Sequence, residues 1–77
     1  GTRMTPKMPI ICAREILRAL ERAGFYFHHQ TGSHIVMRHA DGRRTTVPFH
    51  RGDMKMGTIR ALLREAKISI EEFIDLL

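Results

Sequence analysis

The chain has 77 residues, and 13 Lys or Arg against 8 Asp or Glu give it a formal net charge of +5. This length allows one small domain with one core, and the single cysteine excludes an internal disulfide and favours a reduced, cytoplasmic setting. No apolar run approaches the roughly 20 residues of a membrane span, and the amino-terminal stretch lacks the apolar region of a signal peptide. The excess of basic residues predicts an anionic partner, either nucleic acid or an acidic protein.

Residues 4–77 are expected to form one domain, because no repeat, low-complexity tract or long linker divides them. Gly1, Thr2 and Arg3 precede Met4 and resemble an expression scar, so no functional role is expected of them.

The first predicted element is a helix in the segment CAREILRALERAG, residues 12–24. Gly24 is well placed to end this helix in a left-handed conformation. Its apolar residues recur at the i, i+3, i+4, i+7 spacing of a helix with one buried face: Ala13, Ile16, Leu17, Leu20 and Ala23.

Three β-strands are predicted next, in the segments FYFHHQT (25–31), SHIVMRHA (33–40) and RTTVPF (44–49). The tripeptide Asp41-Gly42-Arg43 is typical of a tight turn, so the strands should form an antiparallel meander. Pro48 has no backbone N–H, which places the third strand at an edge or ends it there.

Alternation along the second strand predicts which side chains face the core. Ile35 and Met37 should point inward, whereas His34 and Arg38 should share the opposite, open face. A histidine and an arginine on an uncovered sheet of a basic protein suit the handling of phosphate groups.

Two helices complete the predicted order. Ile59, Leu62, Leu63 and Ala66 have helical spacing, and Ser69 with Glu72 forms a capping box at the start of SIEEFIDLL. Helices on one face of a small antiparallel sheet give an α+β, two-layer domain. The apolar stripe predicted for the last helix is Ile70, Phe73, Ile74 and Leu77.

The ordered pieces AREILRALERAGFYF, QTGSHIVMRHADGRRTTVPFH and MGTIRALLREAKISIEEFIDLL resemble the HicA toxins, over nearly the whole chain from about residue 8 to 77. The resemblance implies a fold like that of double-stranded-RNA-binding domains, α-β-β-β-α with a short C-terminal helix. It also implies a toxin of a type II toxin–antitoxin system: an endoribonuclease that cuts messenger RNA, halts translation, and is silenced in a hetero-oligomer by a HicB-like antitoxin.

The family's catalytic histidine lies in a Gly-Ser-His triplet, which here is Gly32, Ser33 and His34. Three positions depart from the family pattern. Cys12 and Ala13 stand where a capping serine and a glycine are usual, and cysteine is a poor N-cap, which should cost about 1 kcal/mol of local stability. Lys67 stands where a glycine is usual, so the second helix is expected to continue slightly further.

The chemistry implied by the resemblance needs one acid–base group and no metal or cofactor. RNA carries its own nucleophile, the 2′-hydroxyl, and histidine titrates near working pH. Single-stranded mRNA is the expected substrate, because attack in line with the leaving group needs a flexible backbone. The candidate phosphate-binding residues are Lys7, Arg38, Arg43, Arg44, Arg51 and Lys55, although each also suits an ordinary solvated surface.

Other sites are less favoured. Five histidines without zinc-ligand spacing argue against a metal site, and the neighbours His28 and His29 should face opposite sides of their strand. Cys12 suits a structural role better than a nucleophilic one. The alternative function is a non-catalytic module of the same fold that binds RNA or a protein partner.

Overall fold

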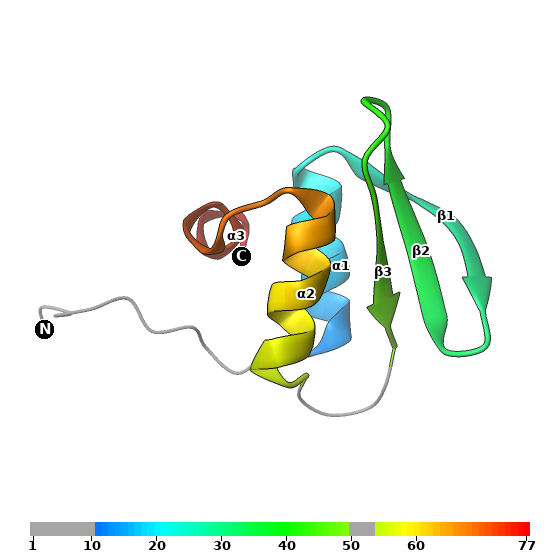
Figure 1. Cartoon of the computed structure of the whole chain (residues 1–77), viewed down its shortest axis with the longest axis horizontal. Coiled ribbons are helices and arrows are strands. Elements are labelled where there is room, and N and C mark those ends of the chain that lie inside the picture. Colours follow the sequence, from blue (N-terminus) through cyan, green and yellow to red (C-terminus); the bar gives the residue numbers. More distant parts are fainter. Residues whose placement is uncertain (1–10, 50–53) are drawn as a thin grey trace, which may run out of the picture.

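The computed structural model describes residues 11–49 and 54–77. Three antiparallel strands in the order β1-β2-β3 carry the helices on one face, and no described element covers the other face (Figure 1). This arrangement confirms the predicted α+β fold. The elements are α1 (Ala13–Arg22), β1 (Phe25–Thr31), β2 (His34–His39), β3 (Arg44–Pro48), α2 (Met56–Ala66) and α3 (Ile70–Leu76).

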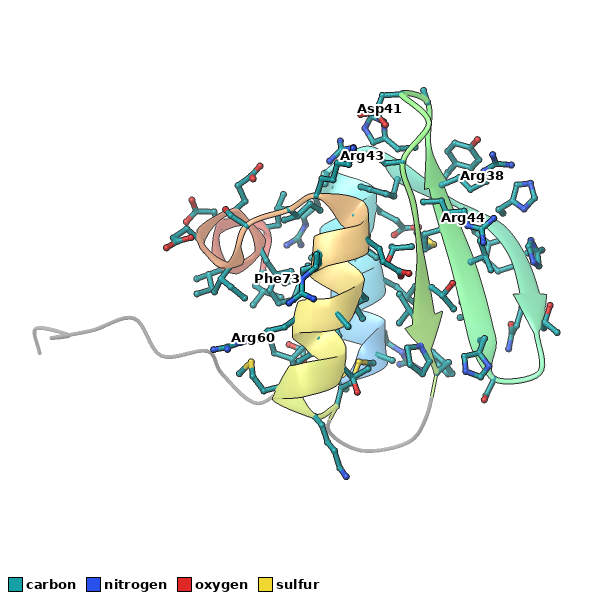
Figure 2. The ribbon with its side chains drawn as sticks, viewed as in Figure 1. Arg38, Asp41, Arg43, Arg44, Arg60 and Phe73 are labelled. Atoms are coloured by element: carbon teal, nitrogen blue, oxygen red, sulfur yellow. The ribbon has the colours of Figure 1, made fainter. Side chains whose placement is uncertain are left out.

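The core lies between the sheet and the helices. Ile35 and Met37 of β2 are buried as their alternation predicted, and Val47 of β3 is buried beside them. Phe73 anchors the short helix α3 in the same core (Figure 2). The buried residues of α1 and α2 are those that helical spacing places on one face: Ala13, Ile16, Ala19 and Leu20, and Ile59, Leu62, Leu63 and Ala66.

Side chains of β3 and of the turn before it bond to the backbone of α2 and set its position. The buried Thr45 hydroxyl donates to the carbonyl oxygen of Leu62 at 2.8 Å. The Arg43 guanidinium donates to the carbonyl oxygen of Ala66, also at 2.8 Å, and lies over the ring of Phe25. These bonds hold α2 beside β3, which is an edge strand of the described sheet.

The predicted extension of the second helix is wrong. Helix α2 ends at Ala66, and Lys67 adopts the left-handed conformation itself, with a φ of 57°. Its backbone N–H donates to the carbonyl oxygen of Arg64, so the lysine occupies a conformation that glycine adopts more readily.

The capping box of α3 is present as predicted. Ser69 Oγ accepts a hydrogen bond from the backbone N–H of Glu72, and the Glu72 carboxylate accepts one from Ser69 N–H. The predicted apolar stripe is only partly correct, because Leu76 packs against the core where Leu77 was expected and Leu77 is 38% exposed.

Candidate functional site

The sheet has an open face, defined by the side chains that point away from the helices. On β2 these are His34, Val36 and Arg38, and strand register identifies their neighbours. None of them is acidic, so the open face is suited to an anion. The full set is Tyr26, His29, Thr31, His34, Val36, Arg38, Arg44, Thr46 and Pro48.

His34 is the first residue of β2, and a tight turn presents it. Gly32 has a φ of 58°, a conformation that costs most other residues energy. The carbonyl oxygen of Gly32 accepts a hydrogen bond from Gln30 at 2.9 Å, and that of Ser33 accepts one from Phe49 N–H. The Gly-Ser-His triplet is therefore held from β1 and from the residue that follows β3, while the His34 imidazole is exposed.

A groove of about 430 Å³ opens beside His34, between β3 and α2. Both apolar and polar side chains line it, and it exists because the hydrogen bonds of Thr45 and Arg43 fix α2 alongside the edge of the sheet. Its lining residues are His34, Thr46 and Pro48 from the sheet, and Thr58, Ala61, Leu62, Arg64 and Glu65 from α2.

Two arginines of the open face lie directly opposite each other. Arg38 of β2 pairs in register with Arg44 of β3, and Figure 2 shows both on the side of the sheet away from the helices. Like charges in this arrangement repel, and an anionic ligand between them relieves the repulsion. With a rise of roughly 3.3 Å per residue, Arg38 lies about 13 Å along the strand from His34, too far for the two Cα atoms to flank one phosphate closely.

The prediction that His28 and His29 face opposite sides is wrong. The register of β1 shifts between Phe27 and His29, so His28 is an extra residue in a β-bulge and the two imidazoles meet, with their Nδ1 atoms 2.6 Å apart. Arg38 Nη1 lies 3.4 Å from the Nε2 atom of His28. His29 is a diagonal neighbour of His34 on the open face, at a separation of roughly 7–8 Å.

Of the remaining predicted cations, the two that the structure describes, Arg43 and Lys55, do not line the groove beside His34. Arg43 lies on the helix side of the sheet, where Asp41, Ala66 and Phe25 engage its guanidinium (Figure 2). Lys55 is exposed at the N-cap of α2. Lys7 and Arg51 lie outside the described residues.

Sequence reasoning missed Thr58, Glu65 and His29 as members of the site. Thr58 and Glu65 reach it only through the packing of α2 on β3, and a bulge of one residue leaves no clear mark in the alternation. Cys12 is a half-buried N-cap, and its N–H donates to Glu15 at 3.3 Å.

Residues 11–49 and 54–77 contain no group of three or more His, Cys, Asp or Glu side chains arranged to hold a metal ion. No helix in them is long and apolar enough to span a bilayer.

Comparison with known proteins adds a family to this geometry. Residues 13–68 match the family model described as HicA toxin of bacterial toxin-antitoxin. The match runs from the start of α1 to just beyond α2, so it includes the whole sheet, the Gly-Ser-His triplet and the groove. No curated protein matches the chain.

Proposed function

Because the chain belongs to the HicA toxin family of bacterial toxin–antitoxin systems, we propose that it is a metal-independent endoribonuclease that cleaves mRNA and inhibits translation. His34 is the catalytic residue of this proposal, and Gly32 and Ser33 form the turn that presents it. The observation that carries the proposal is the position of His34, exposed at the start of β2 where the basic open face meets the groove.

The His34 imidazole is available to a substrate, since its ring nitrogens make no hydrogen bond to any group in the described part of the chain. In the proposed reaction, one ring nitrogen removes the proton of a 2′-hydroxyl. The 2′-oxygen attacks the adjacent phosphorus, the P–O5′ bond breaks, and the leaving 5′-oxygen takes a proton from water. The products are a 2′,3′-cyclic phosphate and a 5′-hydroxyl, and general base help of this kind contributes roughly 10²- to 10⁴-fold.

Arg38 and Arg44 are proposed to bind phosphates next to the one that is cut. Because both arginines are separated from His34 along the strands, they fit contact with a neighbouring phosphate better than contact with the scissile phosphate. His29 is the nearest other basic side chain of the open face, and its diagonal position fits contact with the scissile phosphate itself. Lys55, and Lys7 and Arg51 outside the described residues, remain candidates for outer backbone contacts, whereas the structural partners of Arg43 make it a weaker one.

Single-stranded mRNA is the proposed substrate, since a duplex resists the in-line geometry. The antitoxin partner implied by the family is proposed to be HicB-like. An acidic surface of that partner would complement the open face and bury His34, which explains inhibition without any change in the toxin's fold.

Cleavage of a single-stranded RNA in EDTA tests the proposal. The chain is compared with His34→Ala and with Arg18→Ala, which removes an exposed side chain of α1 outside the groove. We expect the parent chain and Arg18→Ala to produce cyclic phosphate ends, and His34→Ala to lose at least a hundredfold in rate. If no chain cleaves RNA but each binds it with an affinity that falls steeply with salt, the non-catalytic binding module is correct instead.

A further inference from the structure

We propose that the groove beside His34 is a nucleobase subsite and that Glu65 makes it select guanine. This inference rests on the proposed ribonuclease function, because it assigns the groove to a base that flanks the cleaved bond. It goes beyond that function by naming the residue that determines sequence preference.

The groove has the chemistry of a base-binding site. Its apolar lining residues are Pro48, Ala61 and Leu62, which suit the flat face of a base. Its lining also includes Thr46 and Thr58, whose hydroxyls suit the polar edge of a base or a ribose. Single-stranded RNA is recognised in this way, through bases that are splayed out and read along their edges.

Among the described residues, Glu65 is the one carboxylate that lines the groove, and its oxygens are free to accept hydrogen bonds. Thr45 Oγ1 lies 3.3 Å from a Glu65 oxygen but only 2.8 Å from the Leu62 carbonyl oxygen. A hydroxyl has a single proton, so Thr45 donates it to the Leu62 carbonyl oxygen in the shorter bond. Within ranges 11–49 and 54–77 no Lys, Arg or His forms an ion pair with Glu65.

An unpaired carboxylate beside a phosphate-cleaving site repels phosphate, so its natural ligand is a group that donates hydrogen bonds. Guanine is the base whose Watson–Crick edge presents two adjacent donors, N1–H and N2–H, which match the two oxygens of a carboxylate. Adenine and cytosine place a ring acceptor beside their amino group, and uracil flanks its N3–H with two carbonyls. A bidentate contact of this kind discriminates by roughly ten- to a hundredfold.

Chimeric oligonucleotides with one ribonucleotide in a DNA strand confine cleavage to a single bond. Sixteen such substrates vary the base on either side of that bond, and kcat/KM is measured for each. We expect guanine to be preferred at least tenfold at one of the two positions. Glu65→Gln should remove most of that preference, and inosine, which lacks the N2 amino group, should lose about tenfold on the parent chain.

Glu21→Gln is the matched control, because it neutralises an exposed carboxylate of α1 outside the groove. It should keep the guanine preference of the parent chain. Equal cleavage of all sixteen substrates, or a preference that Glu65→Gln leaves unchanged, would overturn the inference while leaving the ribonuclease function intact.

Binding tests the inference even if no chain cleaves RNA. Guanosine 3′-monophosphate is titrated into ¹⁵N-labelled His34→Ala protein, and amide shifts are followed by NMR. We expect changes at Thr58, Ala61 and Glu65 that uridine 3′-monophosphate does not produce and that Glu65→Gln abolishes. Equal changes with both nucleotides, or changes confined to other residues, would show that the groove does not select guanine.

Discussion

The Nδ1 atoms of His28 and His29 lie 2.6 Å apart, although the two residues are consecutive in β1. Arg38 determines how protons are arranged in this pair. A guanidinium only donates, so the Nε2 atom of His28, which lies 3.4 Å from Arg38 Nη1, accepts. His28 then carries its proton on Nδ1 and donates it to Nδ1 of His29. His29 therefore carries its proton on Nε2, which leaves an N–H donor for a ligand of the open face.

The first prediction concerns these tautomers. At about pH 8, long-range ¹H–¹⁵N spectra should show neutral imidazoles, with a protonated Nδ1 on His28 and a protonated Nε2 on His29. Arg38→Ala removes the donor and should return His28 to a mixture of tautomers. A protonated Nε2 on His28 in the parent chain would contradict the arrangement.

The second prediction concerns Gly24, which has a φ of +100° and where an added Cβ would lie 2.7 Å from the Nε2 atom of His39. That ring packs edge-on against Phe25, so it cannot move away freely. Gly24→Ala should lower the free energy of unfolding by about 3 kcal/mol, from backbone strain and overpacking together.

Gly42→Ala is the control for Gly24→Ala. Gly42 has a nearly equal φ of +98°, but no atom lies within 4 Å of its added Cβ. Its cost should therefore be about 1–2 kcal/mol from strain alone. Urea denaturation measures both, and Gly24→Ala made in a His39→Ala background should cost no more, relative to His39→Ala alone, than Gly42→Ala costs in the parent chain. Equal costs for the two alanines would show that the contact with His39 has no effect.

The third prediction concerns the left-handed residue that ends α2. Lys67→Gly should raise the free energy of unfolding by about 1 kcal/mol, because glycine adopts a φ of 57° without the penalty of a Cβ. Lys67→Ala keeps the Cβ and removes the charge, so it should change stability by less than about 0.5 kcal/mol. Thermal unfolding separates the two, and a glycine variant less stable than the alanine variant would contradict the argument.

The fourth prediction concerns Asp41 in the turn between β2 and β3. A hydrogen bond from the backbone N–H of Arg43, at 3.0 Å, is the main reason that the pKa of Asp41 lies below its ordinary value of 3.8. The Arg43 guanidinium, which donates at 2.8 Å, lowers the pKa further. A carboxyl group with a lowered pKa stabilises the fold above its unfolded pKa, and this contribution is lost as the pH falls through the folded value.

With Asp41→Asn, the free energy of unfolding should therefore fall less steeply as the pH drops below 3.8. Melting temperatures measured from about pH 5 downward should fall less steeply for this variant than for the parent chain. Asp75→Asn, at an exposed carboxylate of α3, is the control and should follow the parent chain. A slope for Asp41→Asn equal to that of the parent chain would show that the turn does not stabilise the charged carboxylate.

Local patterns predicted much of the fold. The capping box of Ser69 and Glu72 and the alternation of Ile35 with Met37 depend on neighbours in the sequence, and both were confirmed. The bulge at His28 was missed because one extra residue does not change the β-favouring composition of its strand. Lys67 was misjudged because the core contact of the buried Ile68 that follows it holds the chain in a conformation that lysine alone disfavours.

The candidate site was less predictable than the fold. His34 was placed on the open face by alternation, and the structure has it there. The groove depends instead on Thr45 and Arg43, whose bonds to α2 join residues 17 and 23 positions apart in the sequence. No pattern within either segment indicates that contact, so the role of Glu65 could be proposed only from the structure.

The bulge at His28 also bears on how the protein associates. Strand β1 forms one edge of the described sheet, and a strand with an unbroken row of free backbone groups invites the addition of another strand. The extra residue interrupts that row at its middle, and Pro48 removes a donor at the end of the other edge strand. The sheet is thus protected from edge-to-edge polymerisation, and its shape favours recognition by side chains on its open face.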